Sequence, residues 1–229
     1  MAIMIPHLDV TLPKSLSTLV EERIRDAIVN AELDFGQALP EDGLGLSMGV
    51  SRTPMREALT RLQVQGLVTI LPKRGTFVFK PTVADVDQLA AFRLLLETTG
   101  ARLCIAGARE ATLSALQAAL SLMVETRKLG DQRAYARADT AFHDCFFAHC
   151  GNDYLANAFR TISYKVAALR AHLTVPKTEE QEKSFKEHQR IVVLVRRGQA
   201  EDVCQLLDQH IMRAASAYRA VLEKTPASK

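Results

Sequence analysis

Residues 50–80, "VSRTPMREALTRLQVQGLVTILPKRGTFVFK", decide the fold of the N-terminal part of the chain. Ser51 is a residue type that favours helix N-caps, and Pro54 then falls in the first helical turn, where its missing N–H costs no hydrogen bond. The positions that follow predict a helix with one buried face. The apolar residues of that face are Met55, Ala58, Leu59 and Leu62.

A β-hairpin is predicted directly after this helix. Residues 67–71 and 76–80 are rich in β-branched and aromatic residues, and residues 72–75 between them contain the turn formers proline and glycine. Lys73 and Arg74 lie at the tip of this turn. The hairpin would therefore present two cations at one end.

The order of these elements predicts a winged helix-turn-helix. An amphipathic helix is predicted over residues 18–33, and a short helix ending at Gly49 precedes the basic one. Residues 51–80 hold six basic residues against Glu57 alone, which suits a polyanion. A helix-turn-helix presents the N-terminal residues of its second helix to base edges in the major groove. The alternative is a solvated helix with a charged hairpin tip, but the order helix, turn, basic helix, hairpin favours DNA binding.

The segments "VSRTPMREALTRLQVQGLV" and "PKRGTFV" closely resemble the DNA-binding signature of GntR-family transcription regulators. The chain departs from the family pattern in "EDGLGLSMG", where two glycines lie inside an expected helix and Asp42 stands near a position that is arginine in some relatives. Arginine suits base contacts because its planar fork matches guanine O6 and N7. The residues expected to contact DNA are Arg52, Thr53 and Arg56 on the helix, and Lys73, Arg74 and Gly75 on the wing.

The rest of the chain has only helical signals. We predict helices over residues 83–108, 111–129, 131–149, 153–173, 179–197 and 200–224. The fold class is therefore mainly α, with an N-terminal winged helix-turn-helix and a C-terminal antiparallel helical bundle. We expect the domains at 1–80 and 85–229, joined by a hinge at 81–84, where Pro81 breaks the strand and Thr82 can cap the next helix.

The stretch "ADTAFHDCFFAHCGN", residues 138–152, carries candidate metal ligands. Asp139 and His143 are four apart and share the helix face that also carries apolar residues. His188 and His210 lie on the apolar faces of two later helices. One such histidine is more often a satisfied core residue, but four buried polar groups need a cation or hydrogen-bond partners. A nucleophilic pair of cysteine and histidine is disfavoured because no third orienting group is evident.

The blocks "DTAFHDCFFAHCGN", "EHQRIV" and "DQHI" resemble the FCD ligand-binding domain of the FadR-type branch of the GntR family. The resemblance implies one divalent metal ion per subunit, held by Asp139, His143, His188 and His210. Zinc is the expected ion, and nickel, manganese or iron suit imidazole as well. The resemblance to the FCD domain also suggests that Arg93 binds the carboxylate group of a small effector in a pocket. The alternative for Arg93 is a surface ion pair with Glu97 at i, i+4.

These features predict a DNA-binding transcription regulator, a repressor controlled by a small carboxylate, and not an enzyme. The expected partners are a short palindromic operator and a second copy of the chain. No apolar run is long enough for a membrane span and no export signal is evident, so we expect a cytoplasmic protein with reduced cysteines. The alternatives are a metal-dependent enzyme acting on small organic acids and a constitutive DNA-binding protein with a structural metal.

Overall fold

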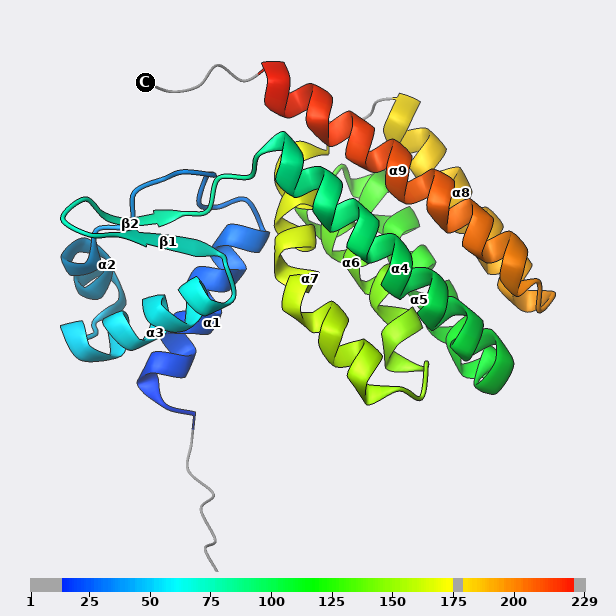
Figure 1. Cartoon of the computed structure of the whole chain (residues 1–229), viewed down its shortest axis with the longest axis horizontal. Coiled ribbons are helices and arrows are strands. Elements are labelled where there is room, and N and C mark those ends of the chain that lie inside the picture. Colours follow the sequence, from blue (N-terminus) through cyan, green and yellow to red (C-terminus); the bar gives the residue numbers. More distant parts are fainter. Residues whose placement is uncertain (1–13, 175–178, 225–229) are drawn as a thin grey trace, which may run out of the picture.

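The computed structural model describes residues 14–174 and 179–224. Residues 1–13, 175–178 and 225–229 lie outside this part, so the predicted domains 1–80 and 85–229 are described only in part. Within the described residues, a small helical domain with a β-hairpin precedes an all-helical domain (Figure 1). The predicted fold class is confirmed.

The N-terminal domain is a winged helix-turn-helix. Its helices are α1 (Leu16–Val29), α2 (Glu41–Met48) and α3 (Arg52–Val64), and its strands are β1 (Val68–Leu71) and β2 (Gly75–Val78). The apolar faces of the helices and the hairpin close over one core. This core includes Val20, Ile24, Ile28, Met55, Leu59, Leu62, Leu67 and Val78.

Two glycines shape the tight connection between α2 and α3. Gly49 ends α2 with a φ of 65°, in the left-handed region that glycine tolerates best. A Cβ on Gly45 would lie 3.0 Å from the carbonyl oxygen of Val50, so a larger residue there would force the two segments apart. Ser51 occupies the N-cap position of α3 as predicted, but its side chain makes no capping hydrogen bond.

The wing is an antiparallel hairpin whose two strands are joined by a tight turn. Leu71 lies opposite Gly75 in the register, and the Arg74 N–H donates to the Leu71 carbonyl oxygen at 3.0 Å. Lys73 and Gly75 both have positive φ, at 61° and 106°. The turn therefore places the two cations of the wing at its outer end.

A capping box marks the start of the helical domain. The Asp85 N–H donates to the Thr82 hydroxyl at 3.1 Å, and the Thr82 N–H donates to the Asp85 carboxylate at 2.8 Å. Because this pair starts α4 at Val83, the predicted hinge at 81–84 overlaps the beginning of the helix. Only residues 81–82 of the hinge lie outside regular structure.

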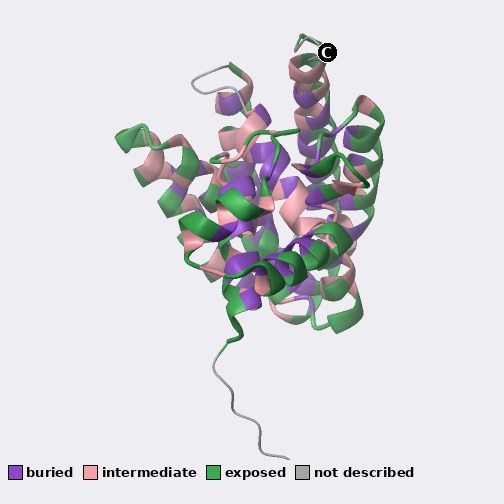
Figure 2. Cartoon of the chain, turned by 90° about the vertical axis from the view of Figure 1, so that its left-hand side faces the viewer, coloured by how far each residue is buried: buried purple, intermediate pink, exposed green. Residues whose placement is uncertain are grey.

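The helical domain contains six helices within the described residues, and each end lies within two residues of its prediction. In space α4 packs along α9, α5 packs along α6, and α8 lies against both α5 and α9 (Figure 1). Buried residues gather where the helices face one another (Figure 2). The helices are α4 (Val83–Gly107), α5 (Arg109–Leu129), α6 (Gln132–Ala148), α7 (Asp153–Leu173), α8 (Glu179–Arg196) and α9 (Ala200–Lys224).

The two domains meet where α1 lies against α7 (Figure 1). Ala168 of α7 is buried in the core of the N-terminal domain. The guanidinium of Arg25 lies over the ring of Tyr164, 4.6 Å from its centroid, in a cation–π contact. Helix α7 therefore belongs to the helical domain and also supports the winged helix. No helix in the described part of the chain is long and apolar enough to cross a membrane.

Candidate nucleic-acid interface and metal centre

Histidines from three helices meet inside the helical domain. His143 of α6, His188 of α8 and His210 of α9 are at most 3% exposed, and one ring nitrogen of each lies within 4.8 Å of the others. The Nε2 atoms of His143 and His188 are 3.4 Å apart. Two nitrogens that each bind a tetrahedral metal at about 2.0–2.1 Å are separated by about 3.3 Å. The spacing of this pair therefore fits two ligands of one metal ion.

Carboxylates hold the outer nitrogens of two of these rings. Nδ1 of His143 lies 2.6 Å from Glu97, and Nδ1 of His210 lies 2.7 Å from Glu187. A carboxylate accepts a hydrogen bond at Nδ1, which leaves the lone pair of Nε2 available for a metal ion. Sequence reasoning did not connect Glu97 or Glu187 with these histidines, because each carboxylate and its histidine lie on different helices.

The electrostatics of the site keep two of the rings neutral. Burial lowers the pKa of His143 to about 4, although the Glu97 carboxylate favours the charged ring. Burial also lowers the pKa of His188 well below its ordinary value. Both imidazoles are therefore unprotonated near neutral pH, which is the form that binds a metal ion.

Asp139, the predicted fourth ligand, lies beside His188, but its carboxylate does not belong to the cluster of ligand atoms that the three histidines form. Its Oδ1 is 3.5 Å from Nε2 of His188, and its Oδ2 forms an ion pair with Arg170 of α7. Burial alone would raise the pKa of the Asp139 carboxyl, but Arg170 and the nearby histidines hold it well below its usual range. The charge of Asp139 is thus already balanced by Arg170, a residue that the sequence did not single out.

Arg93 is buried, at 5% exposure, so the alternative of a surface ion pair is wrong, although Arg93 does pair with Glu97. Its Nε donates to Glu97 Oε1 at 2.8 Å, while its buried Nη2 has no hydrogen-bond partner among the described residues. Burial alone would raise the pKa of the Glu97 carboxyl, but Arg93 and His143 hold it well below its usual range. One carboxylate therefore connects Arg93 to the histidine centre.

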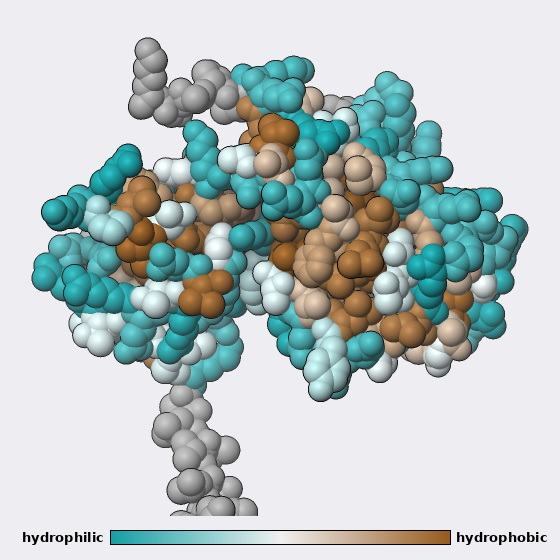
Figure 3. All heavy atoms as spheres, in the orientation of Figure 1, coloured by the Kyte–Doolittle hydropathy of each residue, from teal (hydrophilic) through white to brown (hydrophobic). Residues whose placement is uncertain are grey.

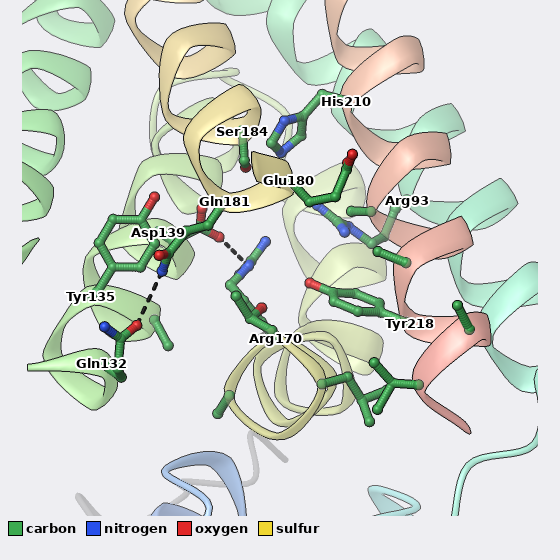
Figure 4. A pocket seen from close by; sticks show the side chains of 18 of the residues that line it. Arg93, Gln132, Tyr135, Asp139, Arg170, Glu180, Gln181, Ser184, His210 and Tyr218 are labelled. Carbon is green, nitrogen blue, oxygen red and sulfur yellow. Dashed lines mark hydrogen bonds and ion pairs between the residues drawn. The ribbon is translucent and has the colours of Figure 1, made fainter. Parts of the chain in front are cut away.

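A cavity of about 290 Å³ opens next to these groups. Figure 4 shows charged and polar side chains from α4, α6, α7, α8 and α9 around it. The hydroxyl of Tyr135 is buried and has no hydrogen-bond partner in the described part of the chain. The cavity therefore offers unused hydrogen-bonding groups to a small polar molecule. The polar residues that line it include Arg93, Tyr135, Asp139, Arg170, His210 and Tyr218.

The predicted DNA-contacting residues of α3 lie at its N-terminal end and are exposed, including Thr53. Arg52 pairs with Asp42 of α2, and Arg56 pairs with Glu41 of the same helix. These ion pairs were not predicted, because α2 and α3 are brought together only by the turn between them.

The wing lies beside α3, as a winged helix requires. Lys73, Arg74 and Gly75 are exposed at its tip. Arg74 and Gly75 line one hollow together with Arg52 and Arg56. The structure thus gathers basic residues from the helix and the wing on one surface.

Two known family models match this chain. The family model described as "Bacterial regulatory proteins, gntR family" matches residues 16–78, and the model described as "FCD domain" matches residues 88–213, more than half of the chain. The chain belongs to the GntR family and carries an FCD domain. The two matches coincide with the winged helix and the helical bundle.

Relatives named as transcription regulators align with nearly the whole chain. The chain is 27% identical over 206 residues to the HTH-type transcriptional regulator YdhC of Bacillus subtilis, covering 88% of this chain and 90% of that protein. It is 27% identical over 242 residues to the HTH-type transcriptional repressor NanR of Klebsiella aerogenes, covering 94% and 90%. The chain is thus a transcriptional regulator of the GntR family.

Solved structures show the same fold. A GntR transcriptional regulator from Rhodococcus sp. RHA1 matches with a TM-score of 0.80 at 23% identity, covering 93% of this chain and all of that one. E. coli McbR/YncC matches with a TM-score of 0.79 at 18% identity, covering 91% and 99%. At this level of identity the likeness concerns the fold alone.

Proposed function

We propose that this GntR regulator is a sequence-specific DNA-binding repressor whose FCD domain binds a divalent metal ion and a small carboxylate effector. The convergence of three buried histidines beside a cavity with an unpartnered arginine nitrogen carries this proposal. The relatives named as NanR repressors support the repressor role. We propose a regulator and not an enzyme, because the chain also carries a complete winged helix.

In this proposal Arg52, Thr53 and Arg56 contact bases or phosphates in the major groove. The wing residues Lys73, Arg74 and Gly75 contact the neighbouring backbone or minor groove. All six residues are exposed, and Arg52, Arg56, Arg74 and Gly75 line one hollow, which supports this assignment. DNA binding also supports a cytoplasmic location. We further propose that the domains divide at 1–80 and 85–229, with a hinge at 81–84.

A homodimer is proposed as the DNA-binding form, because a two-fold symmetric protein places two recognition helices on a palindrome. An apolar stripe on α4 supports a partner surface. Phe92 and Leu103 are each 37% exposed, and Leu95 is 62% exposed. Figure 3 shows hydrophobic atoms gathered on the face of the helical domain where α4 and α7 lie. Monomeric soluble proteins rarely expose large apolar patches, and such patches mark interaction surfaces.

His143, His188 and His210 would hold the metal ion, with Asp139 next to them. Zinc, nickel, manganese and iron all accept imidazole ligands, so the donor set does not distinguish among them. Such an ion supplies a positive charge and open coordination positions for oxygen ligands. Because the three histidines come from three helices, occupancy would also stabilise the fold of the domain.

The charges of the site favour an anionic effector. Arg93 and Arg170 balance Glu97 and Asp139, so the centre is neutral when the histidines are neutral. A divalent ion would raise the charge by two, in a place closed to most solvent. A carboxylate bound at this centre would reduce that charge, and Arg93 could donate to it from its free Nη2.

Contacts of α6 and α7 with α1 provide a route from the cavity to the DNA-binding domain. The Nε2 of His172 donates to the Ile28 carbonyl oxygen at 2.9 Å. Arg137 donates to the Asn30 side chain at 3.1 Å. His172 thus reaches a backbone carbonyl in the last turn of α1, where carbonyls lack partners within the helix, and Arg137 reaches the C-cap residue of the same helix. Both helices also line the cavity, so an effector that moves them would move α1 as well.

Three measurements test the proposal together. Selection of DNA from a random library by the full-length protein should give a short palindrome. Metal analysis after controlled reloading should give one divalent ion per subunit, which is lost in His143→Ala and His188→Ala. A thermal-shift screen should find small carboxylates that stabilise the metal-loaded protein and release the selected DNA. Turnover of such an acid would instead support an enzyme, and DNA binding insensitive to every acid and to chelation would support a constitutive binder.

A further inference from the structure

Asp42 forms an ion pair with Arg52, the first arginine of the recognition helix α3. Arg52 Nε donates to Asp42 Oδ1 at 2.8 Å, and Arg52 Nη2 donates to Asp42 Oδ2 at 3.1 Å. Asp42 lies in the first turn of α2 and Arg52 is the first residue of α3, so the pair spans the two helices of the motif. Both side chains are largely exposed, at 67% and 72%. An exposed ion pair contributes little to folding stability. The main consequence of this pair is therefore its effect on how Arg52 contacts DNA.

The geometry of this pair leaves the other edge of the guanidinium free. Asp42 occupies the side formed by Nε and Nη2. Nη1 makes no hydrogen bond within the described part of the chain, and Nη2 retains a second N–H. The fork formed by Nη1 and Nη2 is the one that an arginine can direct end-on at O6 and N7 of a guanine. Arg52 can therefore contact a base without leaving Asp42.

The pair also changes the charge that the recognition helix presents. A free arginine is attracted to any phosphate, and this attraction is independent of sequence. A carboxylate bound to the arginine cancels most of that attraction, and it repels DNA backbones in general. It also favours one rotamer of a side chain that otherwise samples many. The combined effect favours the one arrangement in which the free fork meets a matching base.

We propose that Asp42 is a positioning residue that converts Arg52 from a general phosphate contact into a base-discriminating contact. This inference rests on the proposed DNA-binding function. Glu41 has a weaker version of the same role, because it holds Arg56 through a single hydrogen bond from Nε at 3.0 Å. The carboxylate of Asp42, near a position that is arginine in some relatives, thus raises selectivity and lowers general affinity for DNA.

The test uses the full-length protein and the operator selected by the wild type. Asp42→Asn removes the charge with almost no change in shape. Glu57→Gln is the matched control, because Glu57 is an exposed carboxylate of α3 that lies 4.0 Å from Arg61 and does not touch Arg52. Dissociation constants are measured by fluorescence anisotropy for the operator, for operators with single base-pair changes and for scrambled DNA, over a range of salt concentrations. The same set is measured for Arg52→Ala and for the double variant.

Asp42→Asn should bind scrambled DNA more tightly, and the salt dependence should steepen by up to about 0.9 in logarithmic slope, equivalent to one phosphate contact. Discrimination at one base pair of each half-site should fall by about five-fold or more, within the 5- to 150-fold range of a bidentate base contact. Glu57→Gln should leave that discrimination unchanged. In the Arg52→Ala background, Asp42→Asn should have no further effect on it.

Two results would overturn the inference while leaving the DNA-binding role intact. The first is an equal gain in affinity for operator and scrambled DNA in Asp42→Asn, with the base preference unchanged, since that is a general charge effect. The second is an equal loss of discrimination in the presence and absence of Arg52, since Asp42 would then act through another group. A wild-type protein that selects no operator would refute the proposed function itself, and this inference with it.

Discussion

Replacing Glu97 with glutamine should destabilise the unliganded protein by about 3–5 kcal/mol, the range found when one partner of a buried ion pair is removed. Glu97 is fully buried and accepts hydrogen bonds from Arg93 at 2.8 Å and from His143 at 2.6 Å. Glutamine has nearly the same shape as glutamate, so the loss of stability comes from removal of the negative charge. Arg93, at 5% exposure, would be left without its direct counter-charge. Small domains are stable by only about 5–15 kcal/mol, so the change is large and measurable by urea unfolding.

The same variant should weaken metal binding by about 10- to 100-fold, because carboxylates that hold a ligating histidine have effects of this size. The Glu97 carboxylate can only accept at Nδ1 of His143, which directs the lone pair of Nε2 inward. A glutamine amide can also donate to Nδ1, which stabilises the tautomer with a hydrogen on Nε2. That tautomer cannot bind the ion. The affinity is measured by competition with a chelator of known strength at pH 7.5.

Glu187→Gln is the matched control. Glu187 holds Nδ1 of His210 at 2.7 Å, but its charged partner Arg213 keeps a second contact with Glu180 at 2.8 Å and is less buried. We therefore expect a similar loss of metal affinity with a smaller loss of stability. A wild-type urea midpoint for Glu97→Gln would refute the buried-charge reasoning. Unchanged metal affinity in both variants would refute the orienting role of the carboxylates.

Three further predictions concern DNA binding, the effector and the domain contact. Arg52→Ala should cost about 1–3 kcal/mol in operator binding and relax one base position, whereas Lys73→Ala should weaken all sequences alike and lower the salt slope. Arg93→Lys keeps the charge but loses the planar fork, so thermal shifts produced by carboxylates should shrink; unchanged shifts would remove Arg93 from the binding site. Burial lowers the pKa of His172 when the two domains are docked. A ring that is released from its contact with α1 keeps an ordinary pKa near 6.5, so it takes up a proton at a higher pH than the docked ring does. Docking of the winged helix should therefore weaken as pH falls below about 6.5. His172→Gln keeps a donor without titrating. In that variant the protection of the amides at the end of α1, expressed relative to their intrinsic exchange rates, should therefore stay the same between pH 7.5 and 5.5, whereas in the wild type it should fall.

Local sequence determined the elements of this protein. Helix ends follow from residues that act on their own neighbours, such as Gly49 with its left-handed φ and Thr82 with its capping box. The faces of the helices follow from spacing, so the sequence predicted correctly that His143, His188 and His210 point into the core. These features need only the periodicity of one helix at a time, which the sequence shows directly.

Pairs within one helix were predictable in identity but not in environment. The i, i+4 rule gives the contact of Arg93 with Glu97, yet it cannot tell a surface pair from a buried one. α4 carries apolar residues on several sides, so its sequence does not show which side faces the bundle. Burial of this pair depends on how α6 and α9 pack against α4.

Tertiary structure decided the partners of the charged groups. Glu97 meets His143 across α4 and α6, Arg170 meets Asp139 across α7 and α6, and Asp42 meets Arg52 across the turn of the DNA-binding motif. Each contact joins side chains whose separation is set by the packing of two helices and not by the spacing within one. A change in the rotation of either helix about its axis would separate them while leaving every local pattern intact. The sequence therefore determined which polar groups face inward, and the packing of helices determined which of them neutralise one another.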